Sequence, residues 1–178
     1  MHAVLYVCLR RAEARSSLQA RKKVCEYLTQ EGFDTELRFS GHCDYFKVGG
    51  RGSGRLSLLR LRYENPKLFD RYWKKYCSTD ITGDQAKQLF RETFPAYRGA
   101  LPICRDQTGV YGMPDDAQIM DEPLFQQLKR GFSESVSYAW ELKEPNVIFT
   151  DDPDDDFEWP KTNNEAAKFW VVVIDYHC

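Results

Sequence analysis

A glycine-rich segment flanked by cations is the part of this sequence that points most directly to chemistry. Residues 49–54 read Gly-Gly-Arg-Gly-Ser-Gly, and backbone N–H groups in such turns can form concave anion-binding sites. The segment lacks the Gly-Lys-Ser/Thr of a P-loop, and we expect it to join two strands as a hairpin. Arginine side chains would add bidentate recognition of phosphate. The predicted phosphate-binding residues are Lys47, Gly49, Gly50, Arg51, Ser53, Arg55, Arg60 and Arg62. The alternative is a flexible hairpin with solvated arginines.

Two histidine–aspartate pairs form a second candidate site. Asp175 and His177 lie two residues apart on a predicted strand and so share a face, and His42 and Asp44 have the same spacing. Such a set is able to bind a metal ion or act as a general acid and base in a phosphoester hydrolase. The chain has only three histidines and neither an HExxH nor a Cys-x-x-Cys motif. We therefore predict no defined metal site and no cofactor, and the alternative role is a cap at the strand end.

An acidic run late in the chain is a third candidate. Its aspartates do not match a calcium-binding EF-hand loop, because no glycine stands at the sixth position. A solvated loop is one interpretation, and a surface for a protein partner, as in an inhibitor or immunity-type protein, is the other. The residues are Asp151, Asp152, Asp154, Asp155 and Asp156.

Aromatic residues are interleaved with cations over residues 62–76. Aromatic platforms with flanking cations bind single-stranded nucleic acid by stacking on its bases. The aromatic residues here, however, also recur at helical spacing, so core packing is the favoured explanation. The segment contains Tyr63, Tyr72, Trp73 and Tyr76 together with Arg62, Arg71, Lys74 and Lys75.

Charge divides the sequence into two unequal parts. Residues 1–112 hold 20 Lys and Arg against 12 Asp and Glu, a net charge of +8, whereas residues 113–178 hold 5 against 15, a net charge of −10. The asymmetry suggests either a basic surface for an anionic partner or mutual attraction between the two parts.

Length and composition bound the class of protein. The chain has 178 residues, a net charge of −2 and 42% hydrophobic residues, which predicts one domain with a buried core and excludes a histone-like protein. The longest apolar run, residues 3–9, is far shorter than the roughly 20 residues of a membrane span. Six scattered cysteines and the absence of a leader-like N-terminus lead us to expect a cytoplasmic protein without a membrane partner.

The first third of the chain predicts a strand, a helix and further strands. Residues 3–10 are apolar enough for a buried strand, and Ser16 with Gln19 matches a capping box at the start of a helix. The predicted inner face of this helix contains Ala14, Leu18, Arg21, Cys25 and Leu28. Residues 43–48 and 55–63 predict two more strands, with a short strand or a loop before them at 35–39.

The remainder predicts helices followed by strands. Asn65 and Pro66 begin a second helix, and a third helix ends before Pro95. Residues 95–120 predict a long irregular connection, and residues 123–131 a further helix. Short strands are predicted at 146–150 and 169–174. The expected fold is α+β, with a mainly antiparallel sheet that begins β-α-β-β and has helices packed on one face.

Three parts of the chain resemble a known set of sequences. Residues 44–54, Asp-Tyr-Phe-Lys-Val-Gly-Gly-Arg-Gly-Ser-Gly, are similar to the Asp-Trp-Phe-x-Ile-Gly-Gly-Arg-Trp-Ser-Gly segment of uncharacterised phage and bacterial proteins. The opening strand and helix and the closing Val-Val-x-Ile-Asp-Tyr-His strand are similar too. Gly52 stands where that set usually has tryptophan. The resemblance implies a small cytosolic protein of phage or mobile-element type and gives no activity.

These observations lead to one first hypothesis and two alternatives. The first is a non-enzymatic protein that contacts the phosphates of a nucleic acid or nucleotide through the basic hairpin. The second is the phosphoester hydrolase described above, so the sequence leaves open whether the protein is an enzyme. The third is an inhibitor or immunity-type protein that acts through its acidic loop.

Overall fold

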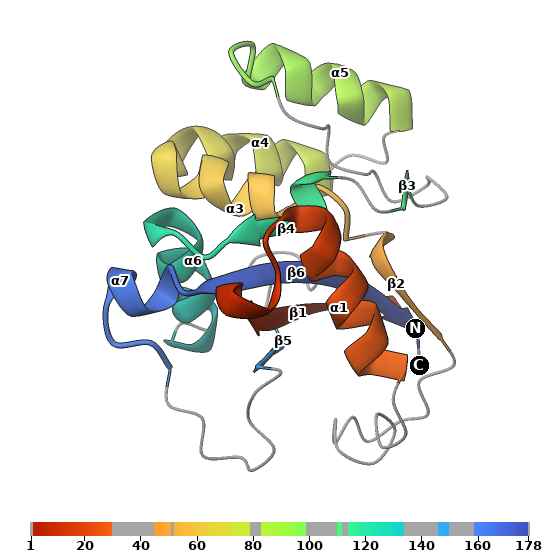
Figure 1. Cartoon of the computed structure of the whole chain (residues 1–178). Helices are drawn as coiled ribbons and strands as arrows, with labels where there is room; N and C mark the ends of the chain where they lie inside the picture. The colour runs from red at the N-terminus through yellow and green to blue at the C-terminus, as the bar shows by residue number, and fades with distance from the viewer. Residues whose placement is uncertain are drawn as a thin grey trace.

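Two long neighbouring strands form the centre of the sheet in this computed structural model. The structure describes residues 2–29, 45–50, 52–78, 83–98, 110–111, 114–133, 146–149 and 159–177. β1 (His2–Arg10) and β6 (Phe169–His177) are antiparallel, paired from His2 with His177 to Arg10 with Phe169. The middle residues of both strands are apolar and buried, and helices cover both faces of the sheet (Figure 1).

Shorter strands complete the sheet. β2 (Tyr45–Gly50) and β4 (Ala117–Ile119) pair antiparallel with β6, and β5 (Asn146–Phe149) is parallel to β1. β3 (Val110–Tyr111) pairs with the end of β2, so the main strand order is β3-β2-β6-β1-β5. The α+β class and the mainly antiparallel sheet are therefore confirmed.

Each face of the sheet has its own core. On one face, α1 (Ser17–Thr29) packs Ala20, Val24 and Leu28 against alternate residues of β1 and β6. On the other face, α3 (Arg55–Glu64) and α6 (Glu122–Ser133) pack leucines against the remaining alternate residues of β1 and β6. The prediction that helices cover one face only is wrong, because both faces of β1 and β6 are apolar.

A third core lies outside the sheet. α4 (Pro66–Ser78) and α5 (Gly83–Thr93) pack aromatic residues against the outer side of α3, so α3 lies between the sheet and this helix pair (Figure 1). The core contains Leu58, Leu61, Phe69, Tyr72, Trp73, Tyr76, Ala86, Phe90 and Phe94. α4 begins at Pro66 and α5 ends before Pro95, as predicted.

The first helix is confirmed, but its predicted inner face is partly wrong. The Ser16 hydroxyl accepts a hydrogen bond from the Gln19 N–H at 3.2 Å, and the Gln19 side chain accepts from the Arg15 N–H at 2.8 Å. Leu18, assigned to the buried face, is 67% exposed, whereas Ala20 and Val24 are buried. The side of α1 that faces the sheet is thus formed by Ala20, Val24 and Leu28.

The described parts of the connections contain three single turns. η1 (Arg11–Glu13) follows β1, η2 (Pro114–Asp116) precedes β4, and α7 (Asn163–Ala166) precedes β6. The segment predicted as irregular over residues 95–120 thus contains β3, η2 and β4. No helix within the described residues is long and apolar enough to cross a membrane.

Candidate functional site

The glycine-rich segment leads from a strand into a helix. β2 ends at Gly50, and α3 begins at Arg55 after the turn formed by residues 52–54. Gly49, Gly50 and Gly54 have φ values of 75°, 51° and 81°, in the left-handed region that favours glycine. The predicted hairpin and the predicted strand over residues 55–63 are therefore wrong.

Carboxylates from the acidic half pack against this turn. The Gly54 N–H donates a hydrogen bond to Oδ1 of Asp116 at 3.2 Å, and Asp116 is completely buried. A Cβ atom on Gly49 would overlap the Asp116 carboxylate, and one on Gly50 would lie 2.6 Å from Cβ of Asp175. The absence of side chains on Gly49 and Gly50 thus makes room for two aspartates of this chain.

Most of the N–H groups described in the turn have partners within the turn itself. Gly52 donates to the Gly49 carbonyl at 2.8 Å, Ser53 to the Gly50 carbonyl at 3.2 Å, and Arg55 to the Gly52 carbonyl at 3.1 Å. With the Gly54 N–H directed to Asp116, these groups stabilise the turn instead of pointing toward an external anion.

The predicted phosphate-binding side chains are not gathered on one exposed hairpin. Arg55 and Ser53 are buried, and Arg62 is half-buried on α3. Arg60 forms an ion pair with Asp121 and donates to Oε1 of Gln118. Lys47 is exposed on β2, and Arg51 lies outside the described residues. Three residues of the predicted set, Gly49, Gly50 and Arg60, lie instead against carboxylates of the acidic half.

The predicted catalytic residues lie partly outside the described part of the chain. Asp175 is buried on β6, where it pairs in register with Val4 and Lys47. His177 pairs in register with His2 and Tyr45. His42 and Asp44, and the acidic run of residues 151–156, are outside the described residues. Within the described ranges, no group of three or more His, Cys, Asp or Glu is arranged to hold a metal ion.

A polar contact joins α3 to the end of the α4–α5 pair. The Ser57 hydroxyl lies 3.4 Å from Oδ2 of Asp115, and Ser57 also hydrogen-bonds the Tyr97 side chain. Burial raises the pKa of Tyr97, the hydrogen bond to Ser57 lowers it, and the charge of Asp115 raises it. These contacts fix the outer helix pair to the centre of the molecule.

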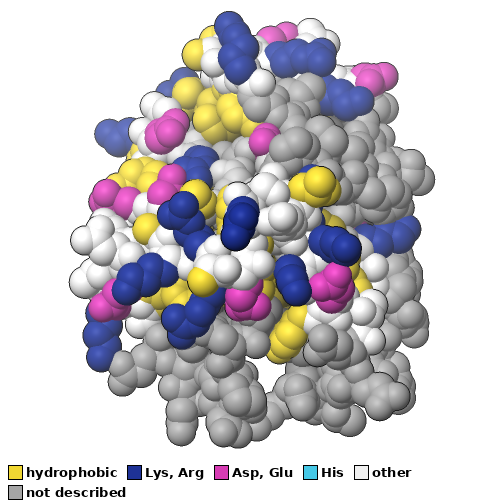
Figure 2. All heavy atoms as spheres, viewed as in Figure 1, with side chains coloured by type: hydrophobic (Ala, Val, Ile, Leu, Met, Phe, Trp, Pro, Cys, Tyr) yellow, Lys and Arg dark blue, Asp and Glu magenta, His cyan; other side chains and the backbone are white. Residues whose placement is uncertain are grey.

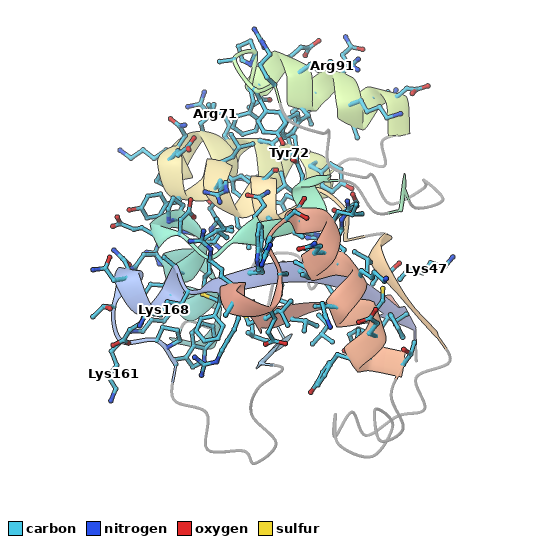
Figure 3. The ribbon with its side chains drawn as sticks, in the orientation of Figure 1. Lys47, Arg71, Tyr72, Arg91, Lys161 and Lys168 are labelled. Atoms are coloured by element: carbon cyan, nitrogen blue, oxygen red, sulfur yellow. The ribbon has the colours of Figure 1, made fainter. Side chains whose placement is uncertain are left out.

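The aromatic residues and the cations of α4 lie on opposite sides of the helix. Phe69, Tyr72, Trp73 and Tyr76 are buried in the third core, where Phe69 and Trp73 stack at 5.8 Å between ring centroids. The charged residues of α4 are exposed, and helical spacing places its cations on the other side. Figure 2 shows Lys and Arg side chains on the surface in the region of α4. Figure 3 shows Tyr72 among the helices and Arg71 on the outside of α4. The prediction that core packing explains the aromatic residues is confirmed.

The exposed cations form a row along α4, which we call the α4 basic row. It consists of Lys67, Arg71, Lys74 and Lys75. Arg71 lies four residues after Lys67, and Lys74 and Lys75 lie three and four residues after Arg71, which places all four along one side of the helix over about 12 Å. Asp70 is the exposed carboxylate of the same helix, so the local net charge is +3. Among the described residues, no carboxylate pairs with Lys67, Arg71 or Lys74.

The sequence contained the signal for this row. Three of its members were noted as cations between aromatic residues, and helical spacing assigns the two types to opposite sides. The glycine-rich segment is the more conspicuous motif in the sequence, but its first two glycines are buried against Asp116 and Asp175, which lie far along the chain.

The comparisons with known proteins give no family for this chain. No family model matches it, and neither a curated protein nor a solved structure is significantly similar.

Proposed function

We propose that this protein binds the phosphate backbone of nucleic acid through the α4 basic row. The observation that supports the proposal is the separation of α4 into a buried aromatic side and an exposed cationic side. The partner class is the one expected from the sequence, but the surface is a helix and not the glycine-rich segment.

Rigid support makes the α4 basic row suitable for binding. Tyr72 contacts Phe90 of α5 and Phe94, the residue after α5, with ring centroids 5.6 and 5.5 Å away, and Trp73 stacks on Tyr76 at 5.2 Å. These contacts fix the backbone that bears the cations, so the loss of conformational entropy on binding is confined to the cationic side chains.

The burial of the apolar side argues against a membrane as the partner. A helix that lies on a membrane buries its apolar face among the lipid acyl chains. In α4 that face is already covered by α3 and α5. The exposed strip therefore offers charge alone, and charge alone is sufficient for sequence-independent contact with phosphates.

Titration with salt tests the proposal. The double variant Arg71→Gln/Lys74→Gln removes two charges from the α4 basic row, and binding of a labelled DNA duplex is followed by fluorescence anisotropy at several salt concentrations. We expect weaker binding and a slope of log K against log salt that is smaller by about 1.8, because each lost phosphate contact changes the slope by about 0.9.

The matched control is Lys22→Gln/Lys23→Gln on α1. It removes the same charge from exposed lysines that lie 3.8 and 3.5 Å from the Glu26 carboxylate, on the other side of the sheet. This control should leave the slope unchanged. Equal effects of the two double variants would reject the α4 basic row, and so would no duplex binding. Binding to anionic vesicles that depends on Arg71 and Lys74, without duplex binding, would assign the row to membranes instead.

A further inference from the structure

We infer that the α4 basic row recognises charge density and therefore favours double-stranded over single-stranded nucleic acid, with no dependence on base sequence. This inference rests on the proposed function and names the substrate class of the same surface. It follows from what α4 exposes and from what its neighbours cover.

Base stacking is not available on α4. Its aromatic residues are only 1–9% exposed, and their rings contact one another and the rings of α5. Proteins that bind single strands obtain about 1–3 kcal/mol per base from stacking on exposed aromatic side chains. A single strand therefore gains from α4 only the attraction between its phosphates and the cations.

Tyr63 is the exposed aromatic residue nearest to the row in sequence, and its position does not favour stacking. Its side chain is 37% exposed, and its hydroxyl donates a hydrogen bond to Oε1 of Glu122 at 3.2 Å. The negative charge of Glu122 beside the ring repels a phosphate backbone. Tyr63 is thus bonded to α6 through Glu122, and the carboxylate of Glu122 opposes the approach of a nucleotide to the ring.

The neighbours of α4 prevent readout of bases. A recognition helix lies inside the major groove, which is about 12 Å wide. α4 is covered by α3 on one side and by α5 on another (Figure 1), and its exposed residues lie on the remaining side. That side contacts the sugar–phosphate backbone, which gives position and affinity but no direct sequence information.

Charge density then decides between the two forms of nucleic acid. Duplex DNA has one negative charge per about 1.7 Å of axis and condenses counterions more strongly than a single strand does. Each neutralised phosphate releases about 0.9 counterions from a duplex and about 0.7 from a single strand. A surface without stacking residues therefore binds the duplex more tightly.

The test compares a duplex with each of its separated strands, using labelled DNA of equal length and anisotropy at one low salt concentration. We expect several-fold tighter binding of the duplex, equal binding of AT-rich and GC-rich duplexes, and no effect of Tyr63→Ala on single-strand binding. Single-strand binding as tight as duplex binding, or a loss of it in Tyr63→Ala, would overturn this inference.

Failure of the proposed function gives a different result. In that case neither DNA form binds, or binding of both is insensitive to Arg71→Gln/Lys74→Gln. Circular dichroism of each variant verifies folding, so that loss of binding is assigned to the side chain that was changed.

Discussion

Two adjacent glycines illustrate how single residues join the two oppositely charged parts of this chain. Gly49 and Gly50 have positive φ values and lie against the side chains of Asp116 and Asp175. The sequence predicts a turn here, because glycine adopts such conformations at little cost. It does not predict the two aspartates: Asp116 is 67 residues after Gly49, and Asp175 is 125 residues after Gly50. The candidate site was misplaced for this reason.

Substitution of Gly50 tests this packing. Gly50→Ala should destabilise the protein by at least about 1–2 kcal/mol, the cost of a left-handed conformation for an ordinary residue. Gly50→Asn tolerates that conformation better but also places a Cβ atom against Asp175. We expect both variants to lower the free energy of unfolding in urea. Near-normal stability of Gly50→Asn would show that backbone conformation alone requires the glycine.

At the scale of elements, α3 and α4 differ in how clearly their sequences predict them. In α3, Leu56 and Leu59 face the sheet while Leu58 and Leu61 face the outer helices, so apolar residues surround much of the helix. That pattern hides the helical period and resembles the alternation of a strand. α4 has one buried side and a clear start at Pro66, so its type and stripe were predictable.

Removal of one aromatic ring from α4 tests the third core. Trp73→Ala should lower the free energy of unfolding by about 3–5 kcal/mol, because it deletes a large buried side chain that stacks on Phe69 and Tyr76. Lys74→Ala, at the neighbouring exposed position, should change it by less than about 0.5 kcal/mol. Comparable urea midpoints for the two variants would contradict the assignment of opposite sides.

At the scale of the whole molecule, charge asymmetry has two consequences. Asp115, Asp116 and Asp121 of the acidic half contact the glycine-rich turn and α3 of the basic half, which accounts for part of the asymmetry as internal attraction. The α4 basic row remains on the surface with a local net charge of +3. The charge counts of the sequence predict both internal attraction and a basic surface. The α+β class with an antiparallel centre is predicted separately, from the apolar strands. Which cations pair with internal carboxylates and which remain on the surface is known only from the tertiary contacts.

Localisation of the bound nucleic acid by NMR tests the central claim most directly. Backbone amide shifts of the isotopically labelled protein are followed while an unlabelled DNA duplex is added. We predict that the largest changes in amide shift occur along residues 67–75 of α4, and that they vanish in Arg71→Gln/Lys74→Gln. Changes centred on the glycine-rich turn or on α1, with α4 unaffected, would contradict it.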